Sequence, residues 1–292
     1  RLVFSTVQAR QLLHFGAGLV GGQMFGQLTA QAAPLVVGVV LGPVPLALYR
    51  SGNRLLTMLT QVTITPLQAA ALSAFSRIRE QPVLAASYLR LTGACSLVAC
   101  PVFVGVGAVA TDLVVLLLGE TWRAAGPIMA VSAVVVGASV LNLFFTPAMT
   151  AAGNARDPLR YYFWATLGNT AFAVAAAPYG ATAVAASQTA RAYAMLPLPL
   201  LSLRRTIGLS PWAALRNIAP PLLAALAMGA VMLWAAQGPL AALAAPARIA
   251  LNAVLGAGTY GLLLLMFGRG FLLRNLAELK PFLPPTLRAR FP

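Results

Sequence analysis

The chain has 292 residues, of which 60% are hydrophobic and 9% are charged, and its mean hydropathy is +0.83. A soluble domain carries about 25% charged residues, so this composition excludes an ordinary soluble protein and indicates an integral membrane protein. The net charge is +15, but the arginines are scattered between apolar runs and do not gather on a polar surface with interleaved aromatic residues. No nucleic-acid partner is therefore expected.

Apolar segments of about 20 residues, separated by glycine, proline and arginine, predict an all-α integral membrane protein with eight transmembrane helices. The segments are residues 12–41, 46–75, 83–118, 125–152, 161–177, 181–203, 212–236 and 249–267. Four of them contain an internal proline, which removes a backbone hydrogen bond and is expected to bend the axis. These prolines are Pro34, Pro66, Pro101 and Pro147.

Arginine and lysine are distributed unequally between the two ends of the predicted helices. One set of ends holds fifteen of them, whereas the other holds only Arg123 and Arg248. Because basic loops stay in the cytoplasm, both termini of this chain are predicted to be cytoplasmic. The chain begins at Arg1 without a leader segment, so we expect it to be part of a longer protein. Residues 268–292 mix apolar and basic side chains, as an interfacial helix on an anionic membrane surface does.

Residues suited to catalysis are few. The single histidine is His14, and the five acidic residues all fall in loops or in the tail; they are Glu80, Asp112, Glu120, Asp157 and Glu278. We find no paired carboxylates, no nucleophile–histidine–acid set and no metal-binding motif, so we expect neither an enzyme nor a cofactor. Cys95 and Cys100 fall on nearly opposite faces of one helix, which favours packing over a disulfide or a metal site.

The second segment carries an unusual polar stripe. At 100° per residue its polar side chains fall within about 80° of one another; they are Arg50, Arg54, Thr57, Gln61, Thr65 and Gln68. If the helix starts near Val44, Arg50 lies about 9 Å deep and Arg54 about 15 Å deep, close to the middle of the hydrocarbon core. Arg50 could extend to the membrane surface, but a central arginine costs about 2.5–3.5 kcal/mol unless it faces water or an anion.

Other segments carry shorter polar stripes, including Gln23, Gln27 and Gln31 in the first and Ser139, Asn142, Thr146 and Thr150 in the fourth. These stripes are equally consistent with hydrogen bonds between helices. Arg191 lies inside the sixth segment. It either faces the same water-filled cavity as Arg54 or pairs with carbonyl groups at a helix end. The candidate substrate-binding residues are thus Arg54, Arg50, Gln61, Thr57, Gln23, Gln27, Asn142 and Arg191.

Five stretches resemble one known family in the same order along the chain. The run LLLGETWRAAGP at 116–127 resembles the element that ends the ninth helix of polysaccharide transporters within the multidrug/oligosaccharidyl-lipid/polysaccharide flippase superfamily. The opening LLHFGAGLVGGQMFGQ, LGPVPLALYRSGNRL at 41–55, TAAGNARDPLRYY at 150–162 and YGATAVA at 179–185 resemble other elements of that family. The sequence departs from the family at Ser51 and Gly52, where members often carry bulkier residues.

The resemblance implies that the eight segments correspond to helices 7–14 of a fourteen-helix, two-lobed flippase of the bacterial inner membrane. Residues 1–203 would form the six-helix C-terminal lobe, 204–267 two additional helices and 268–292 the basic tail; the N-terminal lobe would be absent from this chain. Members translocate polyprenyl-diphosphate-linked oligosaccharide by alternating access, and cavity arginines of related peptidoglycan lipid flippases engage the diphosphate. Arg54 matches one such position best, and Arg50 has a less regular counterpart.

Two alternatives to this function stay open. A cation-coupled multidrug exporter of the same superfamily would carry acidic residues in its cavity. A non-transporting scaffold would recruit the glycosyltransferases or the polymerase of the pathway through its basic loops. The sequence does not distinguish the sugar, the lipid carrier, the coupling ion or the oligomeric state.

Overall fold

The computed structural model describes residues 6–78, 80–154, 156–241, 243–268 and 270–271; for residues 6–19, 22, 23, 66, 69, 70, 72 and 267 it describes the backbone only. Within this part of the chain every regular element is a helix, which confirms the all-α prediction. The α-helices are α1 (Thr6–Leu41), α2 (Pro43–Thr63), α3 (Thr65–Phe75), α4 (Gln81–Ala108), α5 (Ala110–Leu118), α6 (Ala125–Ala133), α7 (Val136–Leu143), α8 (Phe145–Ala151), α9 (Arg156–Ala176), α10 (Ala181–Ala194), α11 (Pro197–Ile207), α12 (Pro211–Gln237) and α13 (Ala245–Phe267). Two short 3₁₀ turns are η1 (Glu120–Trp122) and η2 (Ala177–Tyr179).

Several predicted segments are divided into shorter helices. The fourth becomes α6, α7 and α8, with a bend of 50° between residues 125–133 and 136–151. Proline lies near three of the breaks, because it cannot donate the hydrogen bond that continues a helix: Pro66 follows the break between α2 and α3, Pro147 the break between α7 and α8, and Pro197 begins α11. By contrast, α1 and α4 continue through Pro34 and Pro101.

Within the described residues, four helices are long and apolar enough to cross a membrane: Met24–Leu41 in α1, all of α4, all of α12, and Ala245–Met266 in α13. Counting the bent α6–α8 run as one span gives five. The multi-pass character is therefore supported, whereas the count of eight remains a prediction. The sixth predicted segment is divided into α10 and α11, which are both too short for this criterion, whereas α2 in the second segment is long enough with 21 residues but not apolar enough.

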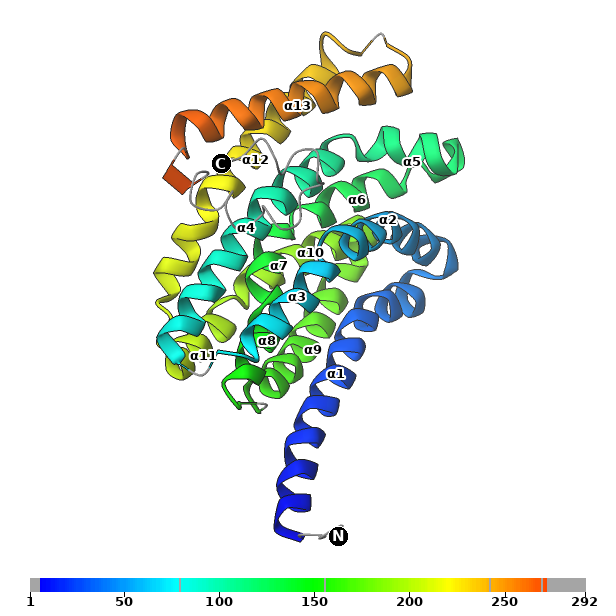
Figure 1. The fold of residues 1–292 in the computed structure, drawn as a ribbon. Coiled ribbons are helices and arrows are strands. Elements are labelled where there is room, and N and C mark those ends of the chain that lie inside the picture. Colours follow the sequence, from blue (N-terminus) through cyan, green and yellow to red (C-terminus); the bar gives the residue numbers. More distant parts are fainter. Residues whose placement is uncertain (1–5, 79, 155, 242, 269, 272–292) are drawn as a thin grey trace.

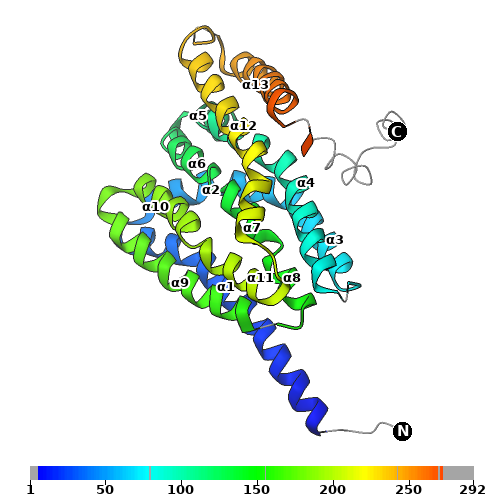
Figure 2. The same ribbon diagram turned by 90° about the vertical axis from the view of Figure 1, so that its left-hand side faces the viewer.

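The helices pack as an elongated bundle in which α12 lies beside α4 and α1 lies beside α9 (Figures 1 and 2). Polar side chains tie both pairs together. Asn217 of α12 donates a hydrogen bond of 2.6 Å to the carbonyl oxygen of Leu89 in α4. The hydroxyls of Thr29 in α1 and Thr166 in α9 lie 2.6 Å apart. These contacts satisfy polar groups inside an apolar bundle, where an unpaired group is costly.

The largest apolar core lies among α4, α6, α7, α8, α11 and α12 and includes the fully buried Tyr88, Phe144 and Met149. The Tyr88 hydroxyl donates a hydrogen bond to the carbonyl oxygen of Leu141 in α7, and this bond stabilises the bent segment near its centre. Cys95 and Cys100 belong to the same core and are both buried and unpaired, as packing residues are expected to be.

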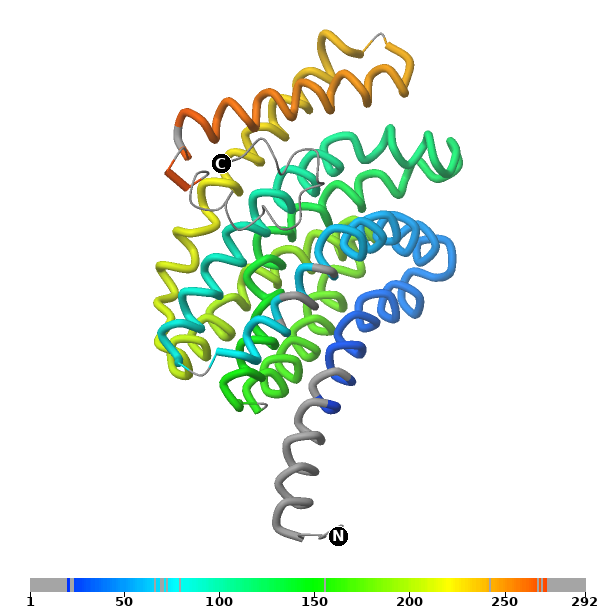
Figure 3. The backbone as a smooth tube through the Cα atoms, in the orientation of Figure 1, coloured from blue at the N-terminus to red at the C-terminus, as the bar shows by residue number. Residues whose placement is uncertain are grey.

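Helix α13 crosses α12 obliquely at one end of the bundle (Figures 1 and 3). Tyr260 of α13 donates a hydrogen bond of 3.0 Å to the carbonyl oxygen of Leu97, near the middle of α4. Phe271 packs against Leu97 and Ala224, so the end of the described chain lies beside the central parts of α4 and α12. The predicted interfacial tail lies outside the described residues from 272 onward.

Basic residues gather where three turns meet at the lower end of the bundle in Figure 1. The turns join α3 to α4, α8 to α9, and α11 to α12. Described basic residues in or near these turns are Arg77, Arg156, Arg160, Arg204, Arg205 and Arg216. We call this the basic end; the alternating turns at the opposite end carry Arg123 and Arg248. The arrangement agrees with the charge asymmetry of the sequence, while the orientation in a membrane remains a prediction.

Candidate functional site

A polar pocket of about 280 Å³ lies inside the bundle among α2, α4, α6, α7 and α10. We call it the central pocket. Its lining residues are Tyr49, Asn53, Leu56, Thr57, Thr60, Ile64, Phe103, Ser132, Val135, Val136, Ser139, Leu143, Ala185, Gln188, Thr189 and Arg191. The pocket is thus a concave site in which apolar side chains stand beside amides, hydroxyls and one guanidinium, as in many ligand sites.

Helix α2 contributes residues spaced three or four apart, which lie on one face of a helix. Three of them donate a local hydrogen bond to the backbone one turn earlier: Asn53 to the Tyr49 oxygen at 2.9 Å, Thr57 to the Asn53 oxygen at 3.0 Å and Thr60 to the Leu56 oxygen at 2.8 Å. The hydroxyl protons are used in these bonds, so the oxygen lone pairs of Thr57 and Thr60 remain as acceptors toward the pocket.

Arg191 is the only ionisable residue among the pocket-lining residues other than Tyr49. It extends from α10 and is half-buried. Its Nε donates a hydrogen bond of 3.2 Å to Oε1 of Gln188, and its Nη1 lies 3.5 Å from the sulfur of Met195. Both partners are neutral, and in the described part of the chain no carboxylate pairs with Arg191.

The surroundings of Arg191 hold its side chain in place. Gln188, which accepts from the guanidinium, itself donates a hydrogen bond of 3.2 Å to the carbonyl oxygen of Asn169 in α9. A Cβ atom at Gly168 would lie 3.0 Å from the terminal carbon of Met195 and 3.8 Å from Cδ of Arg191. The missing side chain at Gly168 thus leaves room for Met195, and the stem of Arg191 lies beside α9 at an ordinary van der Waals distance. A cation held by neutral groups can attract an anion strongly, because nothing in contact neutralises it.

Arg50 and Arg54 lie elsewhere on α2. Both are exposed, neither lines the central pocket, and neither has an ion-pair partner among the described residues. Arg54 follows Asn53 directly, so it lies about 100° around the helix from the pocket face. Gln61 is exposed on the same stripe, and Thr57 lies where the stripe meets the pocket. The structure therefore places Thr57 and Arg191 together and leaves the two α2 arginines on an adjoining surface.

The departure from the family pattern at Gly52 has a packing explanation. Gly52 is buried, and a Cβ atom there would lie 2.8 Å from the carbonyl oxygen of Ala125 and 3.3 Å from the backbone nitrogen of Met129. Because Gly52 has no side chain, α2 can approach α6 closely. Gly52 is on the side of α2 opposite Arg54, and it is not part of the wall of the central pocket.

The remaining predicted site residues are dispersed. Gln27 is exposed on α1, and the side chain of Gln23 lies outside the described part of the structure. Asn142 is half-buried in α7, one turn from the pocket residue Ser139, and its side-chain oxygen is buried without a hydrogen-bond partner among the described residues. Neither Gln27 nor Asn142 lines the central pocket.

Sequence reasoning missed several pocket residues, namely Tyr49, Asn53, Thr60, Gln188 and Thr189. Asn53 and Thr60 lie beside one edge of the arginine stripe on α2, and a wider stripe would have included them. Gln188 lies three residues before Arg191, so helical spacing alone would have linked the two. Thr189 donates a hydrogen bond of 3.1 Å to the Val131 oxygen near the break between α6 and α7, a contact between segments that periodicity cannot reveal.

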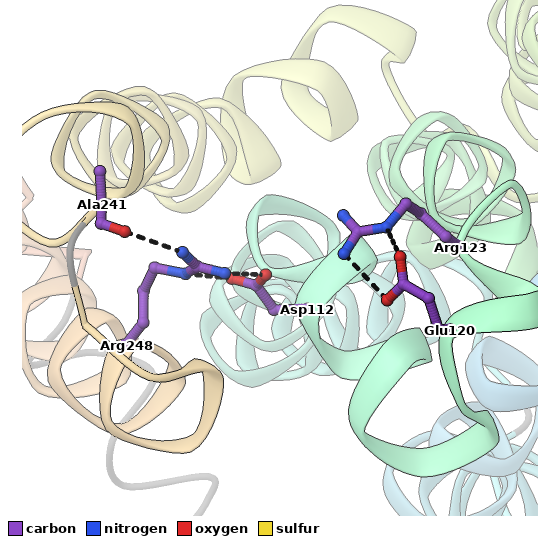
Figure 4. A network of polar contacts seen from close by, with 5 residues as sticks. All are labelled: Asp112, Glu120, Arg123, Ala241 and Arg248. Atoms are coloured by element: carbon purple, nitrogen blue, oxygen red, sulfur yellow. Dashed lines mark hydrogen bonds and ion pairs between the residues drawn. The ribbon is translucent and has the colours of Figure 1, made fainter.

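The two basic residues at the end opposite the basic end are both paired (Figure 4). Arg248 at the start of α13 bonds through Nε to Oδ2 of Asp112 in α5 at 2.7 Å, and through Nη2 to the other carboxylate oxygen. Arg123 bonds to Glu120 three residues earlier at 2.5 and 3.0 Å. The hydrogen bond from Arg123 holds the pKa of Glu120 below its ordinary value. Both pairs lie away from the central pocket, and the residues described contain no cluster of three or more metal-binding side chains.

Known polysaccharide biosynthesis proteins resemble this chain in sequence. Residues 1–127 match a family described as "Polysaccharide biosynthesis protein". The chain is 25% identical over 224 residues to the succinoglycan biosynthesis transport protein ExoT of Rhizobium meliloti (strain 1021), which covers 76% of this chain and 43% of that protein. It is 25% identical over 147 residues to the teichuronic acid biosynthesis protein TuaB of Bacillus subtilis (strain 168), which covers 50% of this chain and 30% of that protein. The chain thus spans less than half the length of the curated relatives it matches.

A solved structure shares the fold. The lipid II flippase MurJ in an inward closed conformation superposes with a TM-score of 0.68 at 13% identity, over 93% of this chain and 57% of that one. At this identity the likeness concerns the fold and not the ligand. The chain is thus similar in sequence to polysaccharide biosynthesis proteins, one of them a transport protein, and it shares its fold with a lipid flippase.

Proposed function

We propose that this chain is the C-terminal part of a flippase that carries a polyprenyl-diphosphate-linked oligosaccharide across the bacterial plasma membrane for polysaccharide assembly. The observation that carries the proposal is Arg191, a half-buried guanidinium that lines the central pocket among neutral polar groups. In the proposed arrangement residues 1–203 form the lobe, 204–267 add two helices, and the N-terminal lobe comes from outside this chain.

The chemistry of the pocket suits a diphosphate joined to a sugar. A guanidinium remains charged at all physiological pH values and presents two donors to an oxyanion at once. Nη2 of Arg191 makes no hydrogen bond among the described residues, so it is available to a ligand. The hydroxyl and amide groups of Asn53, Thr57 and Ser139 offer the donors and acceptors that sugar hydroxyls require.

Arg50 and Arg54 extend the cationic surface beyond the pocket. They lie on the adjoining face of α2, exposed and unpaired among the described residues. We assign them to the part of the path where the diphosphate meets the other lobe. A water-lined path would offset the cost of placing arginine at membrane depth.

Transport needs no covalent step. Two arrangements of the lobes that bind the substrate differently, one open to each side of the membrane, are sufficient for alternating access. The charge of the central pocket favours an anionic substrate, because its lining residues include Arg191 and no carboxylate. A multidrug exporter for cationic compounds would require the opposite charge.

The test measures polymer export and lipid-linked sugar translocation in cells whose chromosomal copy carries Arg191→Ala, so that the whole protein is present. Translocation is expected to fall at least about tenfold, since losing a hydrogen bond to a charged group costs about 1.5–3 kcal/mol. Arg123→Ala is the matched control, because it removes an exposed arginine that is paired with Glu120 away from the pocket. Membrane levels of both variants are measured alongside.

The outcomes separate the candidate functions. Wild-type translocation by a well-expressed Arg191→Ala variant would remove Arg191 from the substrate path. Export of cationic dyes without any effect on polymer would indicate the exporter. No translocation of a fluorescent lipid-linked sugar in vesicles reconstituted with the whole protein, together with loss of polymer in cells that lack it, would indicate a scaffold for glycosyltransferases or the polymerase.

A further inference from the structure

A second pocket, of about 210 Å³, lies between α9 and α11 at the basic end of the bundle and is separate from the central pocket. We call it the α9–α11 groove. Its lining residues are Phe145, Asp157, Arg160, Tyr161, Trp164, Leu198, Leu201, Ser202 and Arg205. The proposed translocation path uses none of them.

The two helices present matching faces to this groove. Helix α9 contributes positions 157, 160, 161 and 164, and α11 contributes 198, 201, 202 and 205. Both sets follow the spacing i, i+3, i+4, i+7, which defines one stripe along a helix. The helices run in opposite directions between the basic end and the interior, so position 205 lies near the beginning of α9 and position 198 farther along it.

The groove is consequently polar at one end and apolar at the other. Arg160 and Arg205 lie toward the basic end together with Ser202, whereas Trp164 and Leu198 lie toward the interior. Seven residues of helix separate the outermost positions, which corresponds to a length of about 10 Å. Trp164 and Leu198 are exposed, with 53% and 43% of their surface accessible, so the apolar end opens outward.

The acidic residue at the polar end is already engaged. Asp157 accepts hydrogen bonds from Ser202 and from the side chain of Asn154, the latter at 3.1 Å. Oδ1 of Asp157 lies 4.0 Å from Nη1 of Arg160, which is the outer limit for an ion pair. Arg205 is exposed and has no hydrogen-bond or ion-pair partner among the described residues. The polar end therefore offers two guanidinium groups to an external anion.

Phe145 and Tyr161 form the floor, with ring centroids 5.4 Å apart in an edge-to-face arrangement. Phe145 is fully buried and belongs to the main core, so the floor is anchored in the bundle. Tryptophan and tyrosine favour the boundary between head groups and acyl chains. A site with arginines at the membrane surface and aromatic and leucine side chains below them has the polarity profile of a phospholipid.

From this profile we infer that the α9–α11 groove is a binding site for one anionic phospholipid, whose phosphate lies between Arg160 and Arg205 and whose acyl chain lies along Trp164 and Leu198. The basic end is the one predicted to face the cytoplasm, where the leaflet is rich in anionic lipid. The bound lipid would connect α9 and α11 at the end where α8, the last helix of the bent α6–α8 run, meets them.

The test uses a protein in which Trp164 is the single tryptophan, with Trp122, Trp212 and Trp234 each replaced by phenylalanine. It is reconstituted in phosphatidylcholine vesicles that contain phosphatidylglycerol or phosphatidylcholine with brominated acyl chains, which quench a tryptophan they touch. Brominated phosphatidylglycerol is expected to quench the fluorescence of Trp164 at a lower mole fraction than brominated phosphatidylcholine does. The preference should fall about fivefold on losing either arginine, since each contributes about 1 kcal/mol.

Matched variants decide the assignment. Arg160→Gln with Arg205→Gln should abolish the preference, whereas the corresponding lysine variants should retain most of it. Arg204→Gln is the control, because Arg204 is an exposed neighbour on α11 that does not line the groove. Equal quenching by the two lipids, or a preference that survives the double glutamine variant, overturns the proposal. A preference that disappears in millimolar inorganic phosphate assigns the groove to a free anion and also overturns it.

Discussion

Arg248 at the first turn of α13 and Asp112 at the first turn of α5 form a two-pronged ion pair that joins elements 136 residues apart in the chain (Figure 4). Both side chains are about one-fifth exposed, at 22% and 18%. Arg248 also donates a hydrogen bond of 3.4 Å to the Ala241 oxygen in the loop before α13. The pair thus fixes the start of α13 against the rest of the bundle.

Removing one member of this pair is expected to destabilise the fold. Asp112→Asn leaves Arg248 without its carboxylate, and the loss should be about 1.5–3 kcal/mol, as for other hydrogen bonds to charged groups. Unfolding in mixed detergent micelles measures the change. A double-mutant cycle with Arg248→Gln isolates the coupling between the two side chains.

Glu120→Gln is the matched control for this cycle, because Glu120 and Arg123 form an exposed pair within one turn. Surface pairs of this kind contribute little to stability, because water screens the two charges. A coupling energy for Asp112 and Arg248 no larger than that of the exposed pair would contradict the assigned role.

Glu120 gives a prediction for pH dependence. The hydrogen bond from Arg123 lowers the pKa of Glu120 below its ordinary value of 4.5. The stabilisation from this pair is therefore present above pH 4.5 and is lost as the pH falls through the lowered folded-state pKa. Carboxyl-carbon NMR of a variant with Glu80→Gln and Glu278→Gln follows Glu120 alone. Arg123→Gln should raise the measured pKa, and an unchanged titration in that variant would show that the pair does not persist in solution.

Gly52→Ala is expected to destabilise the protein. The added Cβ would lie 2.8 Å from the backbone oxygen of Ala125, which cannot move as a flexible side chain can. Forcing α2 away from α6 should cost about 1–3 kcal/mol, as other overpacking changes do. Gly258→Ala in α13 is the control, because its Cβ would meet no atom within 4 Å. Stability in detergent should fall for the first variant and not for the second.

Cysteine accessibility tests whether the arginine stripe of α2 faces water. The native Cys95 and Cys100 are buried, so they give a low background. Arg54→Cys and Gln61→Cys should react with a membrane-impermeant maleimide from one side, because both positions are exposed on the stripe. Val37→Cys, at a buried position of α1 that does not line the central pocket, should stay unreactive. Reaction at neither stripe position would place the stripe against lipid and contradict its proposed contact with substrate.

The sequence by itself determined the class of this protein. Hydropathy and the scarcity of charge are summed over local segments, so they predicted helices and a membrane location without any knowledge of packing. The helical segments and the charge difference between their ends followed from the same local information. The arrangement of α2 did not, since the polar stripe was centred on Arg50 and Arg54, whereas the central pocket uses the neighbouring face with Asn53 and Thr60.

The tertiary structure decided which face of each helix meets the others. Close contact of Gly52 with α6 sets the rotation of α2, and the space beside Gly168 admits Met195, the sulfur of which contacts Arg191. Both are contacts between residues far apart in the chain, which a helical wheel of one segment cannot contain. The same reason explains why the pairing of Asp112 with Arg248 and the groove between α9 and α11 became visible only once the helices were packed together.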